Sequence, residues 1–122
     1  MNQIIPNGLL RVLFAIPFAV FGVMHLMNAT AMQGMVPAYV PGGVIWVYVT
    51  GVLLIAGAIG FILNKSVQMA GFVLGALMLI FIFTIHLPAV LGGDQNSMGS
   101  LLKDFALMTG ALFIGNSTNK KE

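Results

Sequence analysis

The sequence contains a stretch from residue 12 to residue 64 without a single Asp, Glu, Lys or Arg. A second uncharged stretch covers residues 66–93, and a third covers residues 105–119. Only 7% of the chain is charged and 59% is hydrophobic, whereas soluble domains carry about 25% charged residues. A chain of 122 residues cannot bury that much apolar surface in a water-soluble core. The pattern therefore indicates an integral membrane protein whose solvent is the lipid bilayer.

Four segments have the length that a membrane-spanning helix needs, about 20 mostly apolar residues. They cover residues 9–27, 43–63, 67–87 and 99–116. Pro88 is expected to end the third helix. The fourth segment carries Lys103 and Asp104 in its first turns, so a re-entrant or interfacial helix is the alternative there. The sequence predicts an all-α transmembrane four-helix bundle that forms a single domain over residues 1–122.

The basic residues predict the orientation of this bundle. Those on the side of the termini are Arg11, Lys65, Lys120 and Lys121, whereas Lys103 falls on the opposite side. Because short loops with Lys and Arg stay in the cytoplasm, both termini are expected to be cytoplasmic. The apolar run of residues 12–27 is longer than the core of a signal peptide, so we expect it to be retained as a helix.

The composition also excludes several classes of function. Five basic and three acidic residues are too few for the clustered positive charge of a nucleic-acid-binding surface. The chain has no cysteine, which excludes disulfides, thiolate metal sites and thiol redox relays.

Small residues at a spacing of four predict where helices pack. Lipid gives helices no hydrophobic reason to associate, so close backbone contact through small side chains matters more. Gly71 and Gly75 form such a pair in the third segment, and Ala106 and Gly110 form one in the fourth. These faces are expected to hold the bundle together. They also suit a homo-oligomer or a partner membrane protein.

The few polar and aromatic side chains gather at one predicted membrane depth, on the non-cytoplasmic side. The candidate site residues are His25, His86, Lys103, Asp104, Trp46 and Tyr48. Ionisable residues at membrane depth usually face the bundle and mark a functional site. Asp104 is expected to face inward and to contact at least one histidine. Trp46 and Tyr48 also suit interfacial anchoring, and Lys103 could instead extend to the membrane surface.

A quinone is the ligand that this set of residues favours. Its head group has two carbonyls that need proton donors on reduction, and imidazoles titrate near neutral pH. Two histidines and a carboxylate could alternatively ligate a divalent metal, but their spacing specifies no coordination geometry, so no metal site is assigned.

The chain resembles the DoxX-like family of small four-helix membrane proteins over nearly its whole length. The matching features are Arg11, Phe21-Gly22-x-x-His25, Val36-Pro37-Ala38-Tyr39-Val40-Pro41, Tyr48-Val49-Thr50-Gly51, His86-Leu87-Pro88 and Lys103-Asp104. The resemblance implies a link to quinone-coupled sulfur oxidation, in which a relative is the small subunit of thiosulfate:quinone oxidoreductase. More distant relatives resemble membrane chaperones that help channel subunits to assemble.

Two functional hypotheses follow from the residues and the resemblance together. The first is an accessory or quinone-handling subunit of a membrane oxidoreductase system, located in a bacterial inner membrane. The second is a non-catalytic chaperone or scaffold for a partner membrane protein. The sequence leaves open whether the protein is an enzyme.

Overall fold

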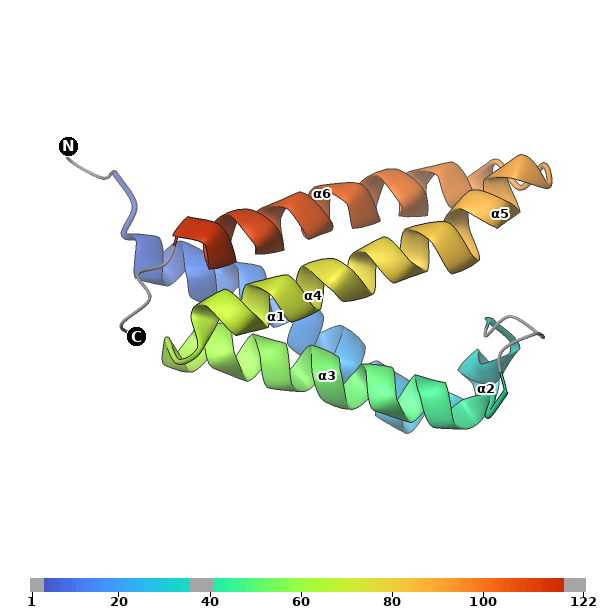
Figure 1. Ribbon diagram of the computed structural model, residues 1–122, viewed down its shortest axis with the longest axis horizontal. Helices are drawn as coiled ribbons and strands as arrows, with labels where there is room; N and C mark the ends of the chain where they lie inside the picture. Colours follow the sequence, from blue (N-terminus) through green and yellow to red (C-terminus); the bar gives the residue numbers. More distant parts are fainter. Residues whose placement is uncertain (1–3, 36–40, 118–122) are drawn as a thin grey trace.

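The computed structural model describes residues 4–35 and 41–117, which form a helical bundle with no strand among them (Figure 1). Its long helices are α1 (Asn7–Met27), α3 (Val44–Leu63), α4 (Val67–Phe81) with its continuation, and α6 (Asn96–Ser117). The short helix α2 (Ala29–Met32) and the 3-10 turn η1 (Gln33–Met35) follow α1. The predicted all-α four-helix bundle is confirmed, with helix ends that differ from the predicted ones by up to three residues except in the third span.

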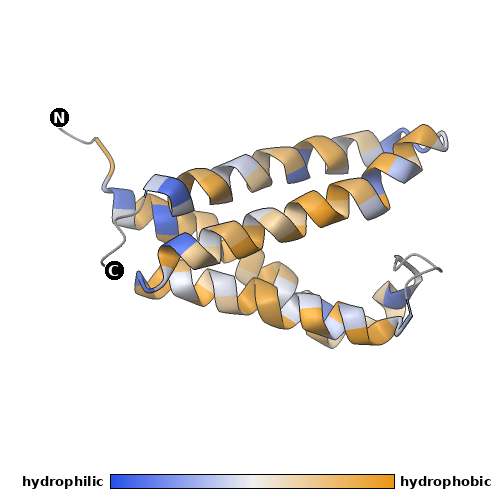
Figure 2. Ribbon diagram, in the orientation of Figure 1, coloured by the Kyte–Doolittle hydropathy of each residue, from blue (hydrophilic) through white to orange (hydrophobic). Residues whose placement is uncertain are grey.

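Most residues along the long helices are hydrophobic, with hydrophilic positions mainly near the helix ends (Figure 2). Large side chains such as Leu13, Phe83 and Phe113 are more than half exposed. Four helical stretches, α6 among them, are long and apolar enough to cross a bilayer. Since a surface of this kind needs an apolar surrounding, the chain is an integral, multi-pass membrane protein.

The third span does not stop at Pro88, contrary to the prediction from the sequence. Instead, α4 continues into a π-helical segment, η2 (Ile82–His86), and then into α5 (Leu87–Leu91). At their junction the N–H of Leu87 donates to the carbonyl of Ile82, five residues back. A regular α-helix would press the proline ring against the carbonyl four residues earlier, and the wider π turn relieves that clash. The span therefore reaches Leu91.

The four long helices form two pairs that diverge from one end (Figure 1). Contacts are most extensive between α1 and α3 and between α4 and α6. The pairs are joined by the tight turn between α3 and α4, where Asn64 and Ser66 both have positive φ. We call the end at this turn the closed end and the other the open end. α1 begins and α6 ends at the closed end (Figure 1).

Aromatic packing and one charged side chain fix the closed end. Phe18 and Phe61 are fully buried, and the Phe14 ring lies 5.3 Å from the first and 6.3 Å from the second, centre to centre. Nε of Arg11 donates to the carbonyl oxygen of Phe61 at 2.7 Å. This carbonyl lies in the last turn of α3, where intrahelical donors run out and a cation is favoured. Arg11 thus ties the start of α1 to the end of α3.

Glycines bring α4 and α6 into backbone contact. A Cβ atom on Gly71 would lie 2.6 Å from the carbonyl oxygen of Ala111 and 2.7 Å from Cα of Gly115. A Cβ on Gly75 would instead meet the Leu112 side chain at 2.6 Å. The α6 residues at this contact are therefore Ala111, Leu112 and Gly115.

The structure corrects part of the predicted packing surface on α6. Ala106 is exposed, so it takes no part in this contact. Gly110 faces α1 rather than α4, because a Cβ there would meet the Phe14 ring at 2.8 Å. Ala106 and Gly110 lie four positions apart on α6, but Ala106 is exposed whereas Gly110 packs against α1.

Candidate functional site

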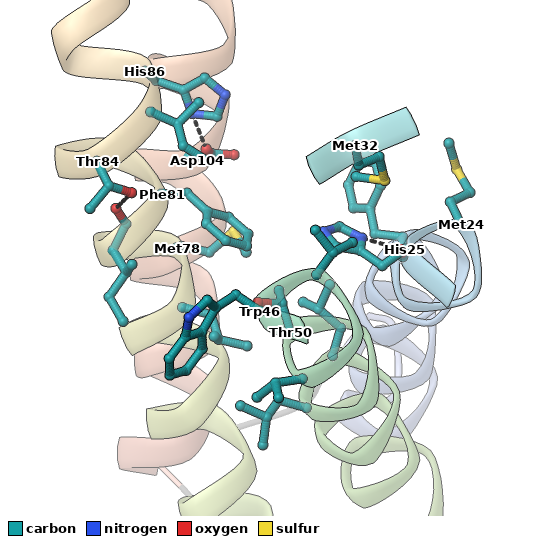
Figure 3. A pocket seen from close by; sticks show the side chains of 18 of the residues that line it. Met24, His25, Met32, Trp46, Thr50, Met78, Phe81, Thr84, His86 and Asp104 are labelled. Carbon is teal, nitrogen blue, oxygen red and sulfur yellow. Dashed lines mark hydrogen bonds and ion pairs between the residues drawn. The ribbon is translucent and has the colours of Figure 1, made fainter. Parts of the chain in front are cut away.

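A cavity of about 530 Å³ lies between the two helix pairs, toward the open end (Figure 3). Its wall combines residues of α1, α2, α3, α4, η2 and α6, and most of them are apolar. Leu54, Leu77 and Met78 belong both to this wall and to the buried core. Cavities that hold small organic ligands measure about 300–1,000 Å³. This cavity is therefore the candidate site.

A histidine and a carboxylate form the polar end of the cavity. Nδ1 of His86, at the end of η2, lies 2.7 Å from Oδ2 of Asp104 on α6. The two side chains are 16% and 5% exposed. Neither atom has another hydrogen-bonding partner among the described residues. Since a buried carboxylate needs a partner, His86 is what makes the position of Asp104 tolerable.

Lys103 and Asp104 point in different directions, because adjacent helical residues are about 100° apart. Asp104 is buried and faces the bundle, whereas Lys103 is exposed. Nζ of Lys103 lies 5.0 Å from the centre of the Phe21 ring on α1. A cation over the face of an aromatic ring is attracted to it. This contact connects α6 to α1 along one side of the cavity.

His25 lies across the cavity from the ion pair and does not join it (Figure 3). Its Nδ1 is 2.6 Å from the carbonyl oxygen of Phe21, one turn earlier in α1. Because a carbonyl only accepts, Nδ1 donates and Nε2 keeps its lone pair in the neutral ring. The imidazole stacks on Phe81 of α4, with ring centres 6.4 Å apart. The two histidines therefore present polar atoms from opposite walls.

The two aromatic residues predicted for the site separate in the structure. Trp46 lines the cavity, and its Nε1 donates to the carbonyl oxygen of Pro41. Both residues are 46% exposed, but Tyr48 does not line the cavity. Two helical positions turn a side chain by about 200°, so only one of these residues can face inward. Tyr48 is removed from the candidate site.

Thr50, Phe81 and Thr84 also line the cavity and were not among the predicted site residues. Thr50 follows Trp46 by four positions and so shares its face of α3. This helical spacing is the signal that could have identified Thr50. Phe81 and Thr84 are three positions apart on the third span, and the Thr84 hydroxyl donates to the carbonyl of Ile80 at 2.6 Å. Phe81 and Thr84 precede His86 by five and two residues, which in a regular α-helix would not place the three side chains on one face. The π-helical segment η2 has more residues per turn and so changes the direction in which these side chains point.

The histidines and acids of the described chain do not gather in a way that could hold a metal ion. No group of three or more His, Cys, Asp or Glu side chains comes together in residues 4–35 and 41–117. His86 and Asp104 form a pair, and His25 is separated from it by the cavity. The alternative of a divalent metal bound by two histidines and the carboxylate therefore has no geometric support.

The fold and the site together define an integral membrane four-helix bundle with a mostly apolar cavity toward its open end. The chain belongs to the family described as Domain of unknown function (DUF8561), whose model matches residues 14–112. That match includes every residue of the cavity wall, from Phe21 to Asp104. No curated protein and no solved structure matches the chain.

Proposed function

We propose that the protein is a DoxX-like quinone-handling subunit of a membrane oxidoreductase system, with the quinone head group in the cavity. The observation that carries this proposal is the His86–Asp104 pair at the end of a mostly apolar cavity inside the bundle. Ionisable residues are costly to place within a membrane, and those that occur there usually mark functional sites. An apolar wall with a few converging polar groups is the usual form of a ligand site.

The polar groups fit the needs of a quinone ring. Reduction of a quinone takes up two electrons and two protons, and each carbonyl oxygen becomes a hydroxyl. His86, backed by Asp104, can donate to one carbonyl, while His25 and Lys103 reach the cavity from the α1 side. The chain has no cysteine to carry electrons. In this proposal a redox centre of a partner subunit supplies the two electrons, and this chain holds the quinone and moves the protons.

The packing favours this proposal over a scaffold for a client helix. Gly71, Gly75 and Gly110 each face another helix of the same chain. These glycines are used within the bundle and do not offer a surface to a partner. A scaffold function would need a different face.

Quinone binding can be tested through the single tryptophan, Trp46, which lines the cavity. We expect ubiquinone-0 to quench its fluorescence saturably in detergent-solubilised protein, because quinone rings are efficient quenchers at contact. Asp104→Asn removes the charge that supports His86 and should raise the Kd by about ten-fold, the effect of losing one charge-assisted hydrogen bond. Mass spectrometry of the lipids co-extracted with the wild-type protein should also detect a quinone.

Asp94→Asn is the matched control, since Asp94 lies in the exposed turn before α6 and accepts hydrogen bonds from Asn96 and Ser97 there. Its Kd should equal that of the wild type. Linear, unsaturable quenching that is identical in all three proteins would contradict the proposal.

The orientation of the bundle is part of the proposal. Arg11 and Lys65 lie at the closed end and Lys103 toward the open end, whereas Lys120 and Lys121 lie outside the described residues. We expect the closed end to be cytoplasmic. Reporter fusions after Lys65 and after Glu122 should give the cytoplasmic signal, and a fusion after Gln95 the opposite one. The same signal from Gln95 and Glu122 would mean that α6 does not span the membrane.

A further inference from the structure

Near the cavity, contacts bridge three of the four seams between the long helices. Between α1 and α3, a Cβ on Gly22 would lie 2.9 Å from the carbonyl oxygen of Gly51. Between α4 and α6, the His86–Asp104 pair bridges the gap. Between α6 and α1, Lys103 lies over the Phe21 ring.

The seam between α3 and α4 has an apolar rim near the cavity. The helices touch near the closed end, where a Cβ on Gly57 would meet the Leu74 side chain at 2.7 Å. Farther toward the open end, Val49 and Leu53 of α3 and Ile80 of α4 line the cavity and are also 40%, 37% and 52% exposed. Side chains that belong both to the cavity wall and to the outer surface mark the rim of an opening, and we call Val49, Leu53 and Ile80 the portal. Met24 of α1 and Lys103 of α6 also line the cavity and are exposed, but the charge of Lys103 makes that side unfavourable for an apolar chain.

The portal is apolar and lies deeper than the polar pair. Ile80 precedes His86 by six residues along the third span, a rise of about 9 Å. The Trp46 side chain lies between α3 and α4 (Figure 3), and Trp46 precedes Val49 by three residues on the open-end side of α3. A molecule whose polar head contacts His86 therefore has its apolar end at the portal, where the surroundings are the hydrocarbon of the bilayer.

We infer that the ligand is a quinone with a long apolar tail, and that this tail leaves the bundle sideways between α3 and α4. The inference rests on the proposed function and specifies its substrate class, a lipid-soluble quinone taken from the bilayer rather than a tail-less one taken from water. The cavity holds the ring, and the portal passes the chain into the membrane. Access from the bilayer then requires no opening of the closed end.

The test compares two quinones in two double variants. Val49→Phe/Ile80→Phe narrows the portal, and Val52→Phe/Ile59→Phe makes the same changes at exposed positions that do not line the cavity. Trp46 remains the single tryptophan in both, so its quenching reports the Kd for decylubiquinone, which has a tail, and for ubiquinone-0, which has none. The portal variant should bind decylubiquinone about ten-fold more weakly, because the tail must be forced past two added rings. Because Val49 and Ile80 also line the cavity, any effect on the ring is common to both quinones. The ratio of the Kd for decylubiquinone to the Kd for ubiquinone-0 should therefore rise about ten-fold over its wild-type value.

The outcomes separate this inference from the proposed function. If the portal variant binds both quinones as the wild type does, the tail does not use this seam, while the proposed function stands. If the wild type binds neither quinone, the proposed function itself fails. Equal losses of both quinones in the portal variant would show that the substitutions block the ring site rather than a tail exit, which also overturns the inference. The control variant should match the wild type with both quinones.

Discussion

Gly71→Leu is expected to lower the free energy of unfolding of the bundle by about 3 kcal/mol or more, at the upper end of the cost of overpacking a core. The clash is with backbone, since even a Cβ on Gly71 would lie 2.6 Å from the carbonyl oxygen of Ala111. A backbone atom cannot move aside without shifting α6 as a whole. The midpoint of thermal unfolding in detergent micelles, followed by helical circular dichroism, should fall accordingly.

Two other glycines provide a graded comparison for this prediction. A side chain on Gly75 would meet Leu112, whose flexible side chain can move, so Gly75→Leu should be the milder change. A Cβ on Gly99 would meet nothing within 4 Å, so Gly99→Leu should leave the midpoint unchanged. Equal midpoints for Gly71→Leu and Gly99→Leu would show that α4 and α6 are not packed against each other as described.

His86→Ala is expected to destabilise the bundle by about 3 kcal/mol, because it leaves a buried carboxylate without its partner. Asp104 is 4% exposed, and the described residues provide no hydrogen-bonding partner for its Oδ2 other than His86. If the cost comes from the orphaned charge, it should shrink when the charge is absent. We therefore expect His86→Ala to cost about 2 kcal/mol less in an Asp104→Leu background than in the wild type.

His25→Ala is the matched control for the histidine deletion. His25 bonds to a carbonyl of its own helix and to no charged group, so its loss should cost about 1 kcal/mol, the worth of an ordinary hydrogen bond. The coupling energy between His86 and Asp104 comes from unfolding titrations in mixed micelles of four proteins. These are the wild type, His86→Ala, Asp104→Leu and the variant that carries both substitutions. A coupling near zero, with equal costs for the two histidines, would mean that His86 and Asp104 do not interact.

The sequence alone was enough to predict the class of protein and the depth of its polar groups. Long uncharged runs have one physical solution in the bilayer, helices that satisfy their own backbone groups. Position along each helix then gives the depth, because every residue adds the same rise. For that reason the residue order by itself assigns His25, His86 and Asp104 to one end of the bundle.

Rotation of each helix about its axis could not be predicted in the same way. In a soluble protein the apolar face marks the core, but here both the buried Leu74 and the exposed Phe72 are apolar, since lipid is as apolar as the interior. The choice between Trp46 and Tyr48, the exposure of Ala106 and the partner of Gly110 all depend on rotation. Only the packed helices decided these points.

The course of the third span and the cavity itself also required the tertiary structure. Pro88 is a reliable stop signal in water, but the π turn before it lets the helix continue through the bilayer, where a break would leave backbone groups unsatisfied. The cavity exists because the two helix pairs share close contacts at the closed end and diverge beyond it. Sequence determined which helices form and which polar groups they carry. The contacts between the helices determined that His86 meets Asp104 and that His25 lies across the cavity from them.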